Sequence, residues 1–274
     1  RGLQQSQPVQ WNLMEAKRLA RQGVKELLVI AQDSTSYGWD LNPKSSLHEL
    51  MYELDTIDEL EWIRLHYAHP AHLNRDMIEA YSKFKKVVPY IDMPVQHGSD
   101  RMLKLMRRGL KSEGIKKRIL ALRHAQPEIA IRTSIIVGFP GETDDDFQQL
   151  MDFIEEVQFD RLGVFTYSEE DGTYAAAEMD DNIPRRVKEE RLDAVMLAQQ
   201  KINLQKNKSL IGLTDKVIVD KMTDDGWAIA RSFRDAPEID NYVRINSKCK
   251  EGEFYNVKYT KAFEYDLYAE IIDE

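Results

Sequence analysis

Side chains that could bind a ligand recur at five points of the chain, each directly after an apolar run. They are Gln32 and Asp33, His66 and His69, Gln96 and His97, Gly138 and Glu142, and Tyr167 and Ser168. Carboxylates and amides can accept hydrogen bonds from an ammonium group, and glycine lets backbone approach a ligand closely. Five repeats of this pattern indicate the mouth of an enzyme barrel better than any single residue does.

The apolar runs before these residues are typical of strands, and the segments between them are typical of helices. Strands are expected near residues 28, 64, 90, 133 and 163, and helices over 11–22, 47–54, 75–84, 112–125 and 144–157. Strands that alternate with helices form a parallel sheet, whose ligands bind at the carboxyl ends of the strands. We therefore predict an α/β domain over residues 1–207, open or closed into a barrel.

Residues 129–147 are the clearest strand–turn–helix unit of the chain. The β-branched run 129–137 suits a strand buried on both faces, and the glycines of 138–141 then break it. Thr143 is a good helix cap, and Ser99 is expected to cap a short helix in the same way. Two interpretations stay open: the turn binds a ligand through Gly138 and Glu142, or its glycines only make the turn.

Three histidines at spacing three, His66, His69 and His72, suggest a metal site. Pro70 breaks any helix that would place them on one face, and in a strand His66 and His69 point to opposite faces. A pocket lined by His69 or His72 is the favoured interpretation. A zinc hydrolase that uses all three is a distant alternative.

Composition limits the classes of protein that fit. The chain has 274 residues, is 42% hydrophobic, carries one cysteine, Cys249, and has a net charge of −9. No apolar run is long enough for a membrane helix, and a lone cysteine excludes a disulfide framework, so we expect a cytoplasmic protein. Acidic charge makes nonspecific nucleic-acid binding unfavourable and suits a basic protein partner.

After residue 207 the pattern changes to short alternating stretches. These stretches are 215–221, 227–231, 242–246, 254–259 and 265–272, with a hairpin signal at Asp225-Gly226. We predict a small antiparallel β-barrel of the OB type over 208–274. Ten Lys and Arg residues against fourteen Asp and Glu residues give this part a charge of −4, which does not favour RNA binding.

Several motifs of the chain resemble one enzyme family. They are Gln32-Asp-Ser-Thr-Ser-Tyr-Gly38, Arg64-Leu-His-Tyr-Ala-His-Pro70, Asp92-Met-Pro-Val-Gln-His-Gly-Ser99, Arg132-Thr-Ser-Ile-Ile-Val-Gly-Phe-Pro-Gly-Glu-Thr143 and Phe165-Thr-Tyr-Ser-Glu-Glu-Asp-Gly-Thr173. Together they resemble the radical S-adenosylmethionine methylthiotransferases, most of all the branch that modifies small-subunit ribosomal protein twelve. The last ~65 residues resemble the TRAM domain that closes these proteins.

The resemblance implies a partial (β/α) radical S-adenosylmethionine barrel followed by a TRAM domain. It also implies methylthiolation of an aspartate β-carbon in a basic ribosomal protein, with an electron donor as a further partner. It implies that Gln32 and Asp33 bind the methionine ammonium of the cofactor, and that the turn from Gly138 to Glu142 approaches its adenine or ribose.

Further roles follow from the same resemblance. Gln96, His97 and Arg132 are candidates for binding the ribose or the carboxylate of the cofactor. Asp224 and Asp225 are candidates for docking the basic substrate protein. The resemblance assigns no catalytic residue.

One departure from the family concerns the iron–sulfur clusters. The family has an N-terminal domain with three cysteines and a Cys-x3-Cys-x2-Cys loop after the first barrel strand, whereas this chain has only Cys249. We therefore expect a fragment without the first domain, the first strand and the cluster ligands. The intact protein would carry two [4Fe-4S] clusters, and this chain none, so that it would be inactive alone.

Two rival functions stay open beside this one. The tRNA-modifying methylthiotransferases share the barrel and the tail, and a basic tail would have favoured them. A barrel that has lost catalysis and only tethers a ribosomal protein is the second rival, and cysteines upstream of this chain would argue against it.

Overall fold

The computed structural model describes residues 3–272, which divide into two compact units. The first comprises the chain up to residue 93 together with 118–130, and the second comprises 94–117 together with the chain from 131 onward. α5 (Ser112–Ala125) runs from one unit into the other. The polypeptide therefore passes between the units more than once, and the predicted domain boundary after residue 207 stays a prediction.

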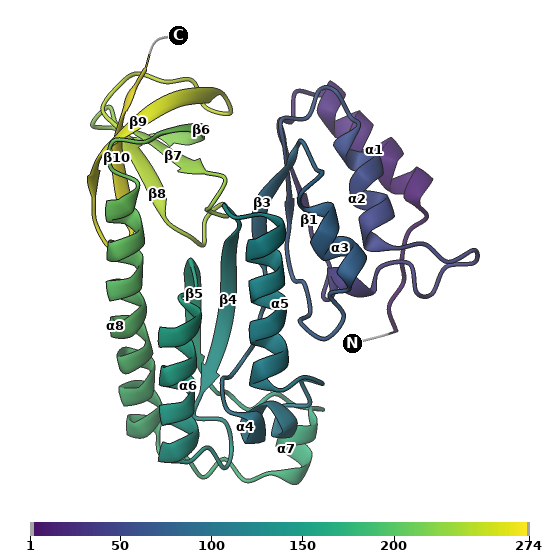
Figure 1. Cartoon of the computed structure of the whole chain (residues 1–274), viewed down its shortest axis with the longest axis vertical. Coiled ribbons are helices and arrows are strands. Elements are labelled where there is room, and N and C mark those ends of the chain that lie inside the picture. The colour runs from purple at the N-terminus through teal and green to yellow at the C-terminus, as the bar shows by residue number, and fades with distance from the viewer. Residues whose placement is uncertain (1–2, 273–274) are drawn as a thin grey trace. The chain divides into compact units, whose positions relative to one another are not determined.

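The first unit alternates helices with parallel strands. Its other elements are α1 (Val9–Arg21), β1 (Glu26–Val29), the 3-10 helix η1 (Ser34–Ser36), α2 (Leu47–Asp55), β2 (Trp62–Leu65), α3 (Arg75–Ala80) and β3 (Val87–Asp92) (Figure 1). β1 pairs with β2 and β2 with β3, both in parallel. The predicted strands near 28, 64 and 90 are thus confirmed.

The second unit contains the rest of the parallel strands and a long helix. Its elements before the small barrel are α4 (Asp100–Leu105), β4 (Ala130–Val137), α6 (Asp144–Val157), β5 (Arg161–Thr166), α7 (Tyr174–Glu178) and α8 (Arg185–Ser209). β4 pairs with β5 in parallel over six residues, from Arg132 opposite Arg161 to Val137 opposite Thr166. The predicted strands near 133 and 163 are thus confirmed.

Caps decide where several helices begin. Thr143 and Asp146 form a reciprocal capping box at the start of α6, and Asn74 accepts a hydrogen bond from the amide of Met77 at the start of α3. Ser99 is the N-cap residue of α4, as expected, but its side chain forms no capping hydrogen bond. Its hydroxyl instead donates to Asp146 Oδ1 at 2.7 Å, because that buried carboxylate needs donors.

Five strands close the small barrel in the order β10-β8-β7-β6-β9. They are β6 (Thr214–Met222), β7 (Ala228–Ser232), β8 (Tyr242–Ile245), β9 (Phe254–Ala262) and β10 (Asp266–Ile271). Four neighbouring pairs are antiparallel, but β10 pairs with β8 in parallel. The prediction of a purely antiparallel barrel needs this correction, because strand direction cannot alternate all the way around a closed ring of five.

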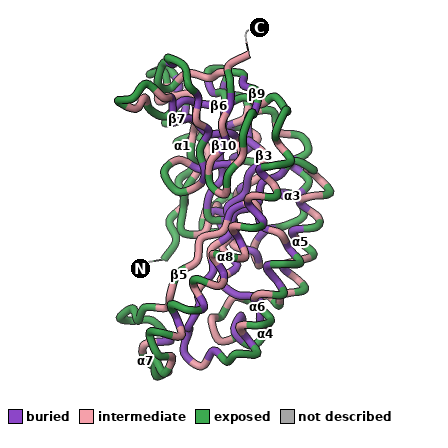
Figure 2. Tube along the Cα trace, turned by 90° about the vertical axis from the view of Figure 1, so that its left-hand side faces the viewer, coloured by how far each residue is buried: buried purple, intermediate pink, exposed green. Residues whose placement is uncertain are grey.

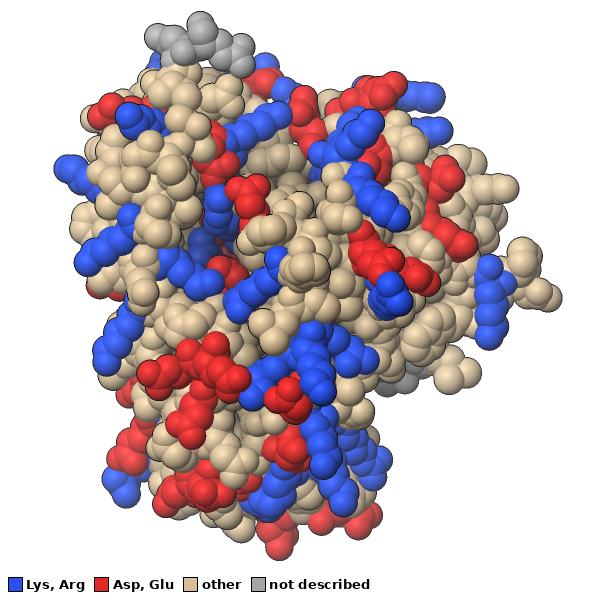
Figure 3. All heavy atoms as spheres, viewed as in Figure 1, with Lys and Arg blue, Asp and Glu red and all other residues tan. Residues whose placement is uncertain are grey.

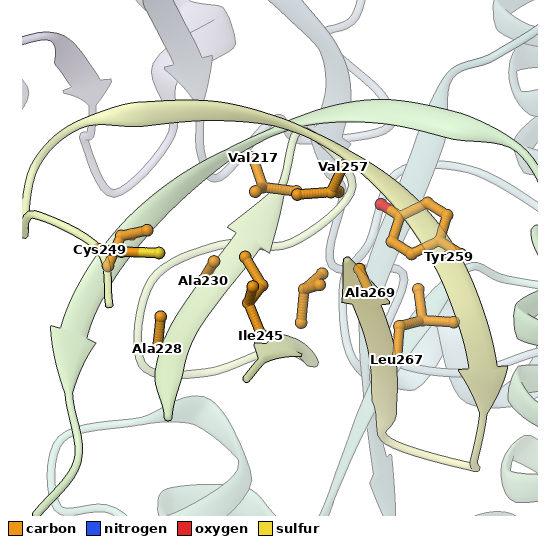
Figure 4. Packing of buried hydrophobic residues seen from close by; sticks show 11 residues of the cluster. Val217, Ala228, Ala230, Ile245, Cys249, Val257, Tyr259, Leu267 and Ala269 are labelled. Carbon is orange, nitrogen blue, oxygen red and sulfur yellow. The ribbon is translucent and has the colours of Figure 1, made fainter. Parts of the chain in front are cut away.

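The core of the small barrel is dry and apolar. Inward-pointing side chains of its strands meet there, among them Val217, Val257, Ile245 and Leu267 (Figure 4). Cys249 packs into the same cluster and is 9% exposed. Burial raises the pKa of its thiol, so this cysteine behaves as a core residue and not as a thiolate.

Burial is greatest in the strands, while the helices alternate between buried and exposed residues (Figure 2). All four residues of β2 are buried, and six of the eight residues of β4. β1 differs, since Leu28 is 37% exposed and the following Ile30 is 59% exposed. No helix within residues 3–272 is both long enough and apolar enough to cross a membrane.

Candidate functional site

The turn between β4 and α6 folds its own glutamate back onto the end of the strand. Gly138 and Gly141 both have positive φ, at +70° and +80°, and the amide of Glu142 donates to the carbonyl of Phe139 at 2.9 Å. The amide of Gly138 donates to the Glu142 carboxylate. A left-handed backbone is cheap only for glycine, which explains the glycines at 138 and 141.

No side chain fits at Gly138. A Cβ atom there would lie 2.3 Å from Cγ of Lys188, a buried residue of α8. Lys188 cannot move away easily, because its Nζ pairs with Asp181 Oδ2 at 2.6 Å and donates to the carbonyl of Tyr167 at 3.2 Å. The ends of β4 and β5 are thus held together through one lysine.

Glu142 is buried between His97 and Arg191. Its Oε1 lies 3.5 Å from His97 Nε2, and its Oε2 lies 3.5 Å from Nη1 of Arg191 on α8. Arg191 also donates to Asp144 Oδ1 at 2.7 Å. The side chain of Glu142 is 0% exposed, so its carboxylate positions the turn and presents no open acceptor at the surface.

His97 is oriented by the backbone that follows it. Its Nδ1 accepts a hydrogen bond from the amide of Ser99 at 2.9 Å, which leaves the proton of a neutral imidazole on Nε2. Nε2 therefore points its hydrogen at Glu142 Oε1, at a distance longer than a hydrogen bond. Both atoms lack a hydrogen-bond partner, so a small closure of this turn would satisfy two buried groups at once.

Gln96 has an unusual backbone for a residue with a side chain. Its φ is +75°, and it forms a parallel bridge with Ile135, with hydrogen bonds of 2.9 Å to Ser134 and Ile136 on either side. Its side-chain Oε1 is buried without a hydrogen-bond partner. Strain together with an unsatisfied amide oxygen is typical of a binding site.

Asp146, on the first turn of α6, ties this turn to the segment that carries His97. It accepts hydrogen bonds from Ser99, Arg101 and Thr143. Burial alone would raise the pKa of its carboxyl, but these hydrogen bonds outweigh burial and hold that pKa well below its usual range. Asp146 is therefore a fixed negative charge that anchors two loops.

Arg132 stands apart from the other predicted residues. It lies near the amino end of β4, where its Nε pairs with Asp240 Oδ1 at 3.2 Å and its Nη1 donates to Ser134 Oγ at 3.2 Å. Burial raises the pKa of Asp240, although Arg132 opposes that shift. The guanidinium thus joins β4 to the loop after β7, and its contact with a cofactor stays a prediction.

In the first unit, Asp33 organises the loop after β1. It caps η1 by accepting from the amide of Thr35 at 3.0 Å, and its Oδ2 lies 2.5 Å from His72 Nδ1. Burial would raise the pKa of Asp33, but hydrogen bonds from Thr35 and His72 lower it below its ordinary value. The carboxylate is therefore ionised at neutral pH and can pair with a cation.

A cavity of about 760 Å³ opens beside Asp33. Its wall includes Gln32, Asp33, Ser34, Ser36, Tyr37 and His72. Gln32 is exposed, and Asp33 is partly exposed. The volume is within the range of small-molecule pockets, and hydroxyl, amide and carboxylate groups on its wall fit an amino-acid ammonium group.

The three histidines do not converge on a metal. His66 Nδ1 faces Asp92 Oδ2 at 3.8 Å, whereas His69 stacks on His72 with ring centroids 4.6 Å apart. Within residues 3–272 no group of three or more His, Cys, Asp and Glu side chains could hold an ion. Cys249 lies in the small barrel's core, so the described residues offer no thiolate ligand for an iron–sulfur cluster either.

The structure groups the sequence-predicted residues in two places. Gln32 and Asp33 lie at one loop of the first unit, and Gln96, His97, Gly138 and Glu142 lie together at the end of β4 in the second. Sequence reasoning missed Lys188 and Arg191, which lie on α8, beyond the five strand ends that were singled out. The sequence signal that could have indicated them is a pair of basic residues three positions apart on a helix that follows an acidic loop.

Asp224 and Asp225 are exposed in the turn between β6 and β7. The hairpin predicted from Asp225-Gly226 is confirmed, and Gly226 has a φ of +87°. Their docking role is untested by the geometry and stays a prediction.

Comparison with family models assigns both parts of the chain. A model of the radical SAM superfamily matches residues 2–154, and a model of the TRAM domain matches residues 211–272. The coproporphyrinogen III oxidase HemN of Escherichia coli, described as a radical SAM enzyme, superposes with a TM-score of 0.55 over 70% of this chain and 45% of its own. At 18% identity this likeness shows the fold alone.

Curated relatives match the chain over its whole length. Ribosomal protein uS12 methylthiotransferase RimO of Clostridioides difficile is 44% identical over 100% of this chain, and RimO of Thermosipho africanus is 46% identical over 95%. The matched part is 62% and 60% of those two proteins. The chain therefore spans less than two thirds of the length of these relatives.

Proposed function

The chain belongs to the radical SAM superfamily, and on this premise we propose that it is the barrel and TRAM part of a methylthiotransferase for ribosomal protein uS12. The reaction would replace a hydrogen on the β-carbon of an aspartate by a methylthio group. The observation that carries the proposal is the match, over both the barrel and the TRAM part, to relatives with that name.

Superfamily membership implies S-adenosylmethionine and an iron–sulfur cluster as cofactors. The described residues suit S-adenosylmethionine, since the Asp33 loop offers an ionised carboxylate beside a cavity of fitting volume. They do not suit a cluster, because the one cysteine is in the core of the small barrel. We propose that the remainder of the protein supplies the ligands of two [4Fe-4S] clusters and covers the exposed Leu28 and Ile30 of the β1 segment.

The chain's own contribution is positioning. Gln32 and Asp33 would bind the ammonium of the cofactor, and the turn from Gly138 to Glu142 would take its adenine or ribose, with Gln96 beside it. His97, Arg191 and Lys188 would hold that turn in place. Contacts of this kind restrict the orientation of a bound cofactor, which is how a protein directs cofactor chemistry.

The first experiment uses the protein in its full natural length, purified without oxygen. Iron, sulfide, cleavage of S-adenosylmethionine and the mass of uS12 after reaction are measured together. Two clusters and one methylthio group on uS12 support the proposal. Modification of tRNA in place of uS12 would show that the protein belongs to the tRNA-modifying branch. Absence of iron would show that the protein is a binding module without catalytic activity.

A second experiment addresses the substrate surface. The acidic charge of the TRAM part suits a basic protein, so Asp224→Lys with Asp225→Lys should weaken uS12 binding, and more so at low salt. Glu251→Lys with Glu253→Lys, in the loop before β9, changes the same charge in the same barrel. Equal loss in both variants would show that only net charge matters and would refute a specific role for the β6–β7 turn.

A further inference from the structure

Residues 101–117 form a basic surface on an acidic chain. This stretch holds seven Lys and Arg residues and one acidic residue, Glu113, which gives it a charge of +6, while the whole chain carries −9. Five of the basic residues are exposed: Arg101, Lys104, Arg107, Lys111 and Lys117. Figure 3 shows blue side chains gathered at the lower right, where Figure 1 draws α4 and α5.

Part of this positive charge is not neutralised by neighbouring carboxylates. Arg101 pairs with Asp146 and Lys116 with Glu156, but the contact of Lys111 with Asp100 is long, at 3.9 Å. Within the described chain, Lys104 and Lys117 form no ion pair. A cluster of exposed like charges costs stability unless a partner of opposite sign uses it.

An aromatic group lies at the edge of the basic surface. The guanidinium carbon of Arg107 sits 3.6 Å from the ring centroid of Tyr174, at the start of α7. Tyr174 is 46% exposed, and Arg107 is exposed and has a φ of +55°. Exposed tyrosine rings and arginine planes are the groups on which proteins stack unpaired bases.

We propose that this basic surface binds the phosphate backbone of RNA, with the Arg107–Tyr174 pair stacking on an unpaired base. The inference deepens the proposed function, on which it rests for the source of the RNA: the proposed substrate is a protein of the ribosome, which contains RNA. An acidic peptide would satisfy the charges but would leave the aromatic stack unused. The remainder of the chain has a net negative charge, which makes RNA binding elsewhere less favourable.

The test compares two double charge reversals in the full natural-length protein. Lys104→Glu with Lys117→Glu changes the surface, and Lys17→Glu with Lys44→Glu makes the same change of charge at exposed positions of α1 and the loop before α2. Binding of a labelled unpaired RNA oligonucleotide is followed by fluorescence anisotropy over a salt series. The first variant should bind about tenfold more weakly, with its salt slope reduced by about 1.4 for two lost phosphate contacts. The second should match the unchanged protein.

A third variant isolates the stack. Tyr174→Ala should lower affinity for the RNA about fivefold or more and leave the affinity for inorganic polyphosphate unchanged. Equal loss in both charge reversals, no RNA binding by the unchanged protein, or stronger binding of polyglutamate than of RNA would overturn the proposal. If the first reversal unfolds in a thermal melt, Lys104→Gln with Lys117→Gln, against Lys17→Gln with Lys44→Gln, takes its place.

These binding measurements are independent of catalysis. Methylthiolation of a short peptide that carries the target aspartate needs no RNA, and it should be unaffected by Lys104→Glu with Lys117→Glu. RNA binding without any methylthiolation would refute the proposed function and leave the basic surface standing. Methylthiolation without RNA binding would refute the role of the basic surface and leave the proposed function standing.

Discussion

The loop after β1 and the turn after β4 both follow a parallel strand, yet they use their polar groups in opposite ways. In the first, Gln32 is exposed and Asp33 borders a cavity of about 760 Å³. In the second, Glu142 and His97 are fully buried and face each other. The first loop keeps its polar groups partly exposed beside a cavity, and the second buries its polar groups against one another.

The difference shows that residue type at a strand end does not fix a residue's role. A carboxylate that is partly exposed contributes little to stability and much to binding, whereas a buried one must be satisfied within the protein. Substitutions in the β4 turn should therefore lower stability first. Substitutions in the β1 loop should lower cofactor affinity with stability nearly unchanged.

The largest effect is expected for Gly138→Ala. Alanine at a φ of +70° costs about 1–2 kcal/mol, and the new Cβ would also overlap Cγ of the tethered Lys188 at 2.3 Å. We expect the free energy of unfolding to fall by about 3 kcal/mol or more, measured by denaturant titration.

Gly141→Ala is the matched control for that clash. Its φ of +80° carries the same strain, but no atom lies within 4 Å of the added Cβ. The loss should stay at about 1–2 kcal/mol. Equal losses of unfolding free energy at Gly138 and Gly141 would show that the Lys188 side chain moves away from the new Cβ and does not hold the turn in place.

Asp146→Asn should have the next largest effect and a distinct pH signature. The folded pKa lies below the ordinary 3.8, so the ionised carboxylate adds stability above that pH and loses it as pH falls. Replacing the charge should cost about 2–3 kcal/mol at neutral pH, since hydrogen bonds to a charged group are lost. Denaturant titrations from pH 7 to acid should show a flatter pH dependence in the variant. Parallel curves would contradict this assignment.

Much of this fold follows from local sequence, because its signals are local. The β-branched run before Gly138 predicts β4, and Thr143 with Asp146 predicts the start of α6. Alternation in the tail predicts five strands near their observed positions. The parallel β8–β10 pair is a consequence of closing five strands into a ring, which no single stretch of sequence encodes.

The candidate site could be predicted only in part, because its supporting contacts are long-range. Gln32, Asp33 and Glu142 were found from their place after strands. Arg191 lies 49 residues beyond Glu142 and reaches it only when α8 packs on the turn. The pairing of Arg132 with Asp240 spans 108 residues, so sequence patterns could not indicate it, and the contact of Arg132 with a cofactor stays a prediction.

Asp33→Asn tests the loop after β1, whose polar groups are partly exposed. Its partner His72 is 37% exposed, so the stability loss should be about 1 kcal/mol or less. Affinity for S-adenosylmethionine should fall about tenfold or more, because a charge-assisted hydrogen bond to the ammonium is lost. Calorimetric titration of the full-length protein measures this, with Asp40→Asn in the same loop as the control. A large stability loss for Asp33→Asn would show that the loop after β1, like the turn after β4, uses its carboxylate to stabilise the fold.

Gln32→Ala should have the smallest effect of all. Its side chain is exposed, so the free energy of unfolding should change by no more than about 0.5 kcal/mol, while cofactor affinity falls a few-fold for one neutral hydrogen bond. Gln96→Gly is its counterpart in the second unit. Glycine relieves the left-handed strain at a φ of +75°, so stability should rise by about 1 kcal/mol even though a polar side chain is removed. If Gln96→Gly destabilises instead, the bridge to Ile135 depends on the glutamine side chain, and Gln96 supports the turn as Glu142 does.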